Sequence, residues 1–85
     1  MADHLTLDKP AIYHIEIQGT LSPDWAAYLG GLEINTSHQQ DSTLTTLEGE
    51  IMDQAALLGV LNSLYNLGFP LLAVEYQSIP KEEKT

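Results

Sequence analysis

The stretch GTLSPDWAAYLGGLEI, residues 19–34, decides the fold, because it either forms a helix between two strands or only turns the chain between them. Ser22 is a good N-cap, and Pro23 suits the first helical position, where its missing N–H costs nothing. Asp24 places a negative charge near the positive end of the helix dipole. The stretch therefore predicts a short helix of about two turns over residues 23–29.

The aromatic residues of this stretch have two interpretations. Gly30 or Gly31 supplies the left-handed residue that ends the helix. Trp25, Tyr28 and Leu29 are three and four residues apart and share one helix face. We predict that this face packs on the sheet, so that Trp25→Ala destabilises the protein by about 3–5 kcal/mol. In the alternative, Trp25 or Tyr28 lines a small ligand pocket beside the Gly-Gly turn, where missing side chains let a ligand approach the backbone.

Four segments alternate apolar and polar residues, as is typical of strands with one buried face. They are residues 11–19, 32–36, 43–51 and 71–77. In the third segment the set predicted to face inward is Thr45, Leu47, Gly49 and Ile51, and Gly49 suggests a bulge or close packing by a helix. The polar run SHQQDS, residues 37–42, predicts a loop longer than a tight hairpin turn.

A second, longer helix is predicted over DQAALLGVLNSLYNLG, residues 53–68. Asp53 is the candidate N-cap, and Gly68 followed by Pro70 ends the helix. Gly59 costs about 1 kcal/mol relative to Ala in a helix interior, which a close crossing with another element would explain. The predicted apolar stripe is Leu57, Val60, Leu61, Leu64 and Leu67.

The order of these elements predicts the fold class. Two βαβ halves with right-handed crossovers give an α+β, ferredoxin-like two-layer sandwich (β-α-β-β-α-β), with a four-stranded antiparallel sheet and both helices on one face. If residues 22–30 form only a turn, the alternative is a three-strand meander followed by a helix and a last strand. We expect one domain over residues 11–78, a loose arm over 1–10 and a flexible charged tail over 79–85.

Composition excludes several classes of function. Twelve Asp and Glu residues against three Lys and no Arg give a formal charge of −9, so binding to nucleic acid or to anionic membranes is not expected. The chain has no cysteine, hence no disulfide and no thiolate nucleophile. No segment approaches ~18 uninterrupted apolar residues, and the N-terminus lacks the basic and apolar regions of a secretory signal. We therefore expect a cytoplasmic protein.

The predicted sheet face without helices is rich in acidic residues. Around His14 it carries Glu16, Glu48, Glu50 and Glu75, which form a candidate surface for a protein partner, with Leu71 and Ala73 among its apolar exceptions. The histidines lack metal-ligand spacing, and solvated charges explain this face better than a weak divalent-ion site at Glu48 and Glu50. We predict no metal, no cofactor and no assignable catalytic residue.

Several short motifs resemble a group of small bacterial single-domain proteins. They are G-x-L-x-P-x-W at 19–25, G-G-L at 30–32, E-G-x-x-x-D-Q-A-A-L-x-G-x-L at 48–61 and L-x-x-L-G-x-x-L-L at 64–72. The resemblance covers roughly residues 11–77, and the D-Q-A-A-L-x-G-x-L run is its most distinctive part. The group has no assigned reaction or cofactor, so the resemblance transfers no catalytic residue to this chain.

Three hypotheses for function follow from these residues. The preferred one is a non-catalytic binding module that acts as a homo-oligomer or as an adaptor for a protein partner, through edge strands that invite pairing. The second is a small-ligand sensor that uses Trp25, Tyr28, Gly30 and Gly31, or the open sheet face with His14. The third, by analogy with similar folds alone, is a cofactor-free enzyme with His14 as general base.

Overall fold

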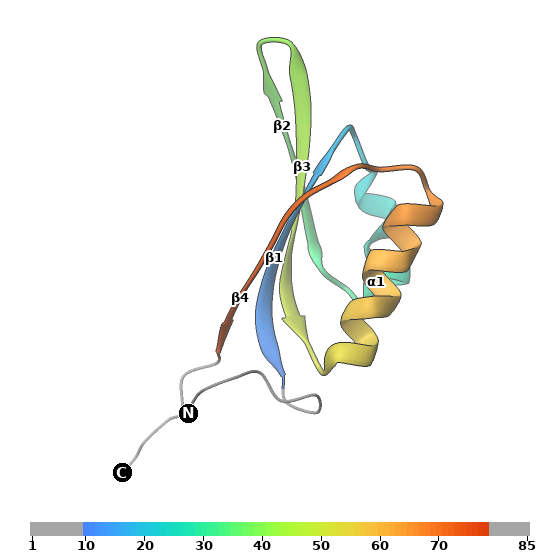
Figure 1. Cartoon of the computed structure of the whole chain (residues 1–85). Helices are drawn as coiled ribbons and strands as arrows, with labels where there is room; N and C mark the ends of the chain where they lie inside the picture. Colours follow the sequence, from blue (N-terminus) through green and yellow to red (C-terminus); the bar gives the residue numbers. More distant parts are fainter. Residues whose placement is uncertain (1–9, 79–85) are drawn as a thin grey trace.

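The computed structural model describes residues 10–78, so the predicted arm (apart from Pro10) and the predicted tail lie outside the described residues. The chain runs through β1 (Ala11–Gln18), the 3-10 helix η1 (Pro23–Leu29), β2 (Glu33–Gln39), β3 (Ser42–Ile51), α1 (Gln54–Asn66) and β4 (Leu71–Ser78). The four strands form one antiparallel sheet in the order β2-β3-β1-β4. Both helices lie on the same side of this sheet (Figure 1).

The prediction of an α+β fold with a four-stranded antiparallel sheet and two helices is confirmed. Because β1 pairs with β3 and β4, the alternative of a three-strand meander is wrong. The alternation of β1 is that of a strand with one buried face, since Tyr13, Ile15 and Ile17 are at most 3% exposed. The core lies between this face and the helices, and it consists of Ala11, Tyr13, Ile15, Ile17, Leu21, Leu29, Leu32, Ile34, Leu47, Ile51, Val60 and Leu64.

The inward set predicted for β3 is confirmed for Thr45, Leu47 and Ile51, which are all buried. A Cβ at Gly49 would lie 2.9 Å from Leu32 Cδ2, so this glycine is closely packed as predicted. The neighbour is a side chain just before β2, however, and not a helix. Gly59 differs, because it is exposed and a Cβ there would meet nothing within 4 Å. A close crossing within the described residues therefore does not explain Gly59.

The polar run at residues 37–42 is not the loop that was predicted. β2 continues through Ser37 and His38 to Gln39, and β3 begins at Ser42, which leaves only two residues for the turn. The hairpin extends beyond the layer of helices, so both of its faces meet solvent (Figure 1). Without a buried face there is no apolar alternation, and the pattern used to detect strands is absent.

The short helix is confirmed in position but not in type or packing. Ser22 Oγ accepts a hydrogen bond from Asp24 N at 3.2 Å, and Gly30 ends the helix with φ of 78°. A 3-10 helix has three residues per turn, so residues i and i+3 eclipse one another. Leu29 therefore faces the core together with Ala26 rather than with the aromatic residues. The prediction that Trp25 and Tyr28 anchor the helix is wrong, because these residues are 37% and 78% exposed.

The long helix begins as predicted, with the Asp53 carboxylate accepting a hydrogen bond from Ala56 N at 2.8 Å. Gly68 follows it in the left-handed region, with φ of 88°. Of the predicted stripe, Val60 and Leu64 are buried, whereas Leu67 is 39% exposed. The buried residues of this helix join a core that contains no residue of β4.

Candidate functional site

The open sheet face brings together the residues predicted as a partner surface. The strand register places His14 opposite Glu48 on β3 and opposite Glu75 on β4, and Glu33 of β2 lies opposite Glu48. Directly opposite residues of antiparallel strands share a face, so one histidine and three carboxylates form a row across all four strands. Like charges that face each other, as Glu33 and Glu48 do, destabilise a sheet.

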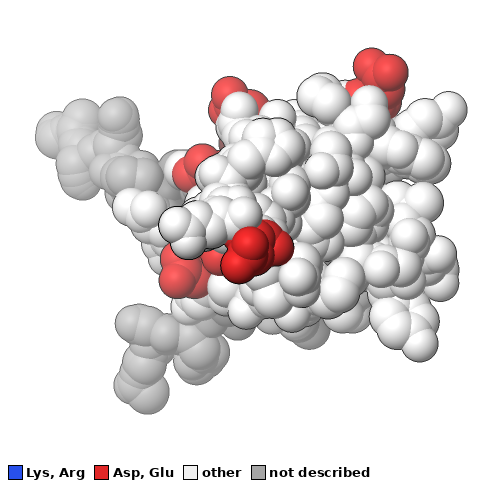
Figure 2. All heavy atoms as spheres, turned by 90° about the horizontal axis from the view of Figure 1, so that it is seen from above, with Lys and Arg blue, Asp and Glu red and all other residues white. Residues whose placement is uncertain are grey.

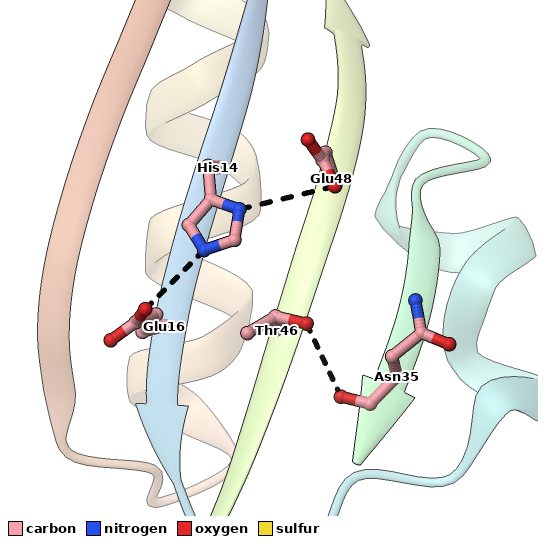
Figure 3. A network of polar contacts seen from close by, with 5 residues as sticks. All are labelled: His14, Glu16, Asn35, Thr46 and Glu48. Carbon is pink, nitrogen blue, oxygen red and sulfur yellow. Dashed lines mark hydrogen bonds and ion pairs between the residues drawn. The ribbon is translucent and has the colours of Figure 1, made fainter. Parts of the chain in front are cut away.

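His14 is the centre of the polar contacts on this face (Figure 3). Its Nε2 lies 3.3 Å from Glu16 Oε2 and its Nδ1 lies 3.9 Å from Glu48 Oε1. Nearby, Thr46 Oγ1 donates a 3.4 Å hydrogen bond to the Asn35 carbonyl. These side chains are half-buried or exposed, so water screens their interactions. Within residues 10–78 no group of three or more His, Asp or Glu is placed to hold a metal ion.

The residues predicted to bind a ligand do not form one site. Trp25 and Tyr28 are neighbours, with ring centroids 5.5 Å apart, and they flank a hollow of about 300 Å³ against Ser63 and Leu67 of the α1 region. Tyr28 and Gly30 border a second hollow of about 350 Å³, with Gly59 on its far side.

Gly31 stands apart from these two hollows, since it lines neither of them and a Cβ there would meet nothing within 4 Å. His14 lies on the opposite face of the sheet, so the proposed base and the aromatic pair cannot act on one substrate. The four glutamates lie on the same face as His14: Glu16, Glu48 and Glu75 lie around it, and Glu50 lies two register pairs away, opposite Ile12.

The surface between α1 and β4 is a further candidate site, which was not predicted from the sequence. A hollow of about 500 Å³ lies there, and it is lined mainly by apolar residues that include Leu61, Tyr65, Phe69 and Leu71. Leu71 was predicted on the open face, but a register shift after Glu16 places it opposite the buried Ile17, on the helix side. The bulge at this point supplies the extra residue that changes the face.

We call the apolar region that adjoins this hollow the β4–α1 surface, made by Leu61, Tyr65, Leu71, Val74 and Tyr76. Tyr65 is 80% exposed, and Leu71 and Tyr76 are each about half exposed. Val74 and Tyr76 lie opposite Ile15 and Tyr13, so they point to the helix side of the sheet, where the described helices leave them 37% and 47% exposed. A signal for this surface is present in the sequence, because residues 54–74 contain no charged residue.

Charge is distributed unevenly between these surfaces. Of the twelve acidic residues, Asp3, Asp8, Glu82 and Glu83 lie outside the described residues, which leaves eight. The three lysines, Lys9, Lys81 and Lys84, also lie outside, so the surface of residues 10–78 has carboxylates at separate points and no lysine or arginine (Figure 2). None of the eight carboxylates belongs to the β4–α1 surface.

Comparison with known proteins identifies a family whose function is unknown. A profile of the family described as domain of unknown function DUF8691 matches residues 12–75. No curated protein matches the chain, and neither does any solved structure. Neither helix in the described range has the length and apolar character needed to cross a membrane.

Proposed function

The chain belongs to the DUF8691 family, whose domain has no known function, and we propose that it is a non-catalytic interaction module that works as a homo-oligomer. The observation that carries this proposal is the β4–α1 surface. Leu71, Val74 and Tyr76 are between 37% and 50% exposed on a strand that contributes no residue to the core of the described domain. Contiguous apolar patches of this kind mark interaction sites on proteins.

The two edge strands of the sheet, β2 and β4, differ in their exposed residues, and this difference supports the same proposal. Edge strands present unpaired N–H and C=O groups, and proteins protect them with charged and polar residues. Every exposed residue of β2 is polar, among them Glu33, Asn35 and Ser37, and its one apolar residue, Ile34, is buried. β4 has the sequence LLAVEYQS, and its exposed residues include the large apolar side chains of Leu71, Leu72, Val74 and Tyr76. β4 is therefore the edge that we expect to be paired.

We also propose that the fold is a ferredoxin-like two-layer sandwich. Support comes from the chain order of strand, helix, strand, strand, helix and strand, together with the placement of both helices on one side of the sheet. The departure is that the first helix is a seven-residue 3-10 helix instead of an α-helix. The cytoplasmic location stays a prediction.

Light scattering tests the proposed oligomer. We expect a mass of at least twice the 9.4 kDa of one chain, together with dissociation when Val74→Lys places a charge on the β4–α1 surface. The matched control is Ser37→Lys on the opposite edge strand, which should keep the wild-type mass. Circular dichroism of both variants checks that they are folded. A 9.4 kDa particle for the wild type at all concentrations would refute the proposal.

A small-ligand sensor is the second candidate, and the 500 Å³ hollow favours it, because ligand pockets of this size with mostly apolar linings are common. Its lining has no basic residue, which favours uncharged apolar ligands. Fluorescence of Trp25, in the neighbouring hollow on the other side of α1, is one readout, and backbone NMR shifts of Tyr65 and Leu71 are a closer one. Unchanged shifts across a panel of uncharged apolar metabolites would exclude this function for that panel.

A further inference from the structure

We propose that a second copy of this chain pairs with β4 antiparallel about a twofold axis at Val74, so that the two four-stranded sheets form one continuous sheet of eight strands. This inference rests on the proposed function, because it specifies how the homo-oligomer forms. The proposal specifies which edge strand pairs and which residues lie opposite each other. The exposed apolar residues of β4 indicate the edge strand, and the position of Glu75 in β4 limits the alignment.

The absence of charged residues from the β4–α1 surface favours a second copy of this chain as the molecule that binds there. A basic partner would be drawn to the glutamates around His14, on the other face of the sheet, and not to the β4–α1 surface. The β4–α1 surface carries no charge that would hold a charged partner. A second copy brings to it a surface that is equally uncharged and equally apolar, which is the self-complementarity that a twofold interface requires.

The side-chain pattern of β4 limits the register. In an antiparallel pair, opposite residues share a face, so the twofold axis must pass through a residue position and not between two. An axis at Glu75 would place two carboxylates directly opposite each other, which is destabilising. An axis at Val74 places Val74 against Val74 of the second copy and Ala73 against Glu75. An axis at Ala73 would pair only five residues of the strand Leu71–Ser78, whereas the axis at Val74 pairs seven.

The pairing also covers the neighbouring apolar side chains. Tyr76 lies on the helix side of β4, two residues from the proposed axis, and its ring is 5.9 Å from that of Tyr13. In the paired sheet, Tyr76 of one copy lies beside the bulged start of β4 of the other, near Leu71 and the 500 Å³ hollow. The hollow would then be closed on its β4 side by the second copy.

Cysteine cross-linking tests the register, because the natural chain has no cysteine. Disulfides need Cα–Cα distances of about 4.4–6.8 Å, and opposite residues in an antiparallel pair meet this requirement. We expect Val74→Cys to form disulfide-linked dimers under mild oxidation at least several-fold faster than Glu75→Cys. Tyr76→Cys should not cross-link, since its two copies would lie about 14 Å apart along the strands. Ser37→Cys on β2 measures random collision.

Each outcome separates this inference from the proposed function. Light scattering of the reduced Val74→Cys variant establishes whether it is still an oligomer. If the reduced protein is a dimer and Glu75→Cys or Ser37→Cys cross-links fastest, the register or the edge is wrong, while the homo-oligomer stands. If the wild type and the reduced variant are both monomeric, the proposed function itself fails. Fast cross-linking of Val74→Cys alone in a dimeric protein supports the inference.

Discussion

The rings of Tyr13 and Tyr76 lie 5.9 Å apart across the β1–β4 pair, yet Tyr13 is 3% exposed and Tyr76 is 47% exposed. The two residues face the same side of the sheet from adjacent strands. The boundary of the hydrophobic core therefore passes between them. The hydrophobic core contains residues of α1 and of the other three strands but none of β4, and the apolar surface continues onto β4. This relationship underlies the proposal that β4 has a partner.

The burial of Tyr13 predicts a loss of stability at alkaline pH. Desolvation raises the pKa of the Tyr13 hydroxyl above 10, and the nearby Tyr76 raises it further. Below about pH 10 the residue is protonated in the folded and unfolded states alike, so it adds no pH dependence. Above that pH the unfolded chain loses the proton first, and the free energy of unfolding falls until the pH reaches the folded-state pKa.

Chemical denaturation between pH 8 and 11 measures this effect. Tyr13→Phe should show a smaller alkaline loss of unfolding free energy than the wild type. Tyr28→Phe is the matched control, because Tyr28 is 78% exposed and lies outside both the core and the β4–α1 surface. If the unfolding free energy of Tyr13→Phe and of the wild type fell equally between pH 8 and 11, Tyr13 would not be the cause of the alkaline loss.

Thr45 is the buried polar residue that ties β3 to the turn after β1. Its hydroxyl donates a 2.6 Å hydrogen bond to the Gly19 carbonyl and accepts one from Leu21 N at 3.3 Å. Thr45→Val would leave both backbone groups without this partner, at a cost of about 1–3 kcal/mol of unfolding free energy. Urea denaturation tests this, with Thr46→Val on the open face as the control. A loss as small as that of the control would contradict the prediction.

The packing of the 3-10 helix predicts unequal effects at two neighbouring positions. Leu29 is 1% exposed, so Leu29→Ala should lower the unfolding free energy by about 2–5 kcal/mol. Trp25 is 37% exposed, and Trp25→Ala should cost about 1 kcal/mol, well below the value expected when its side chain was assigned to the core. Urea denaturation of both variants compares them directly, and a larger loss for Trp25→Ala would contradict this packing.

These two positions also show what the sequence could and could not predict. The capping residues Ser22, Pro23 and Gly30 locate the helix correctly, because capping depends on local chemistry. They do not determine whether the helix has 3.0 or 3.6 residues per turn, and that difference decides which side chains face the core. Trp25 was assigned inward by α-helical spacing and by its size. The structure turns Ala26 and Leu29 inward instead.

Strands were predicted well wherever one face is buried. β1 and the second half of β3 show this, because burial imposes the alternation of apolar and polar residues. The hairpin of β2 and β3 was missed beyond Thr36, where neither face is buried. The position of Leu71 was also missed, since a bulge changes the face of a residue without changing the sequence pattern. The open face around His14 was predicted correctly from alternation alone.

The charge of the chain predicts how salt affects association. Each copy carries a formal charge of −9, so two copies repel each other at long range even though the β4–α1 surface is uncharged. Salt shortens the Debye length from ~30 Å at 0.01 M to ~10 Å at 0.1 M and weakens this repulsion. The dimer dissociation constant should fall as salt increases, which sedimentation velocity measures. Dissociation promoted by salt would indicate an interface held by ion pairs and would contradict an apolar one.

The most direct measurement is amide hydrogen exchange along the two edge strands at several protein concentrations. If β4 pairs with a second copy, the backbone amides of Leu71–Ser78 that point away from β1 become protected, and their protection increases with concentration. The outward amides of β2 (Glu33–Gln39) serve as the internal reference and should exchange rapidly throughout. Outward amides of β4 that exchange as fast as those of β2 at every concentration would contradict the account.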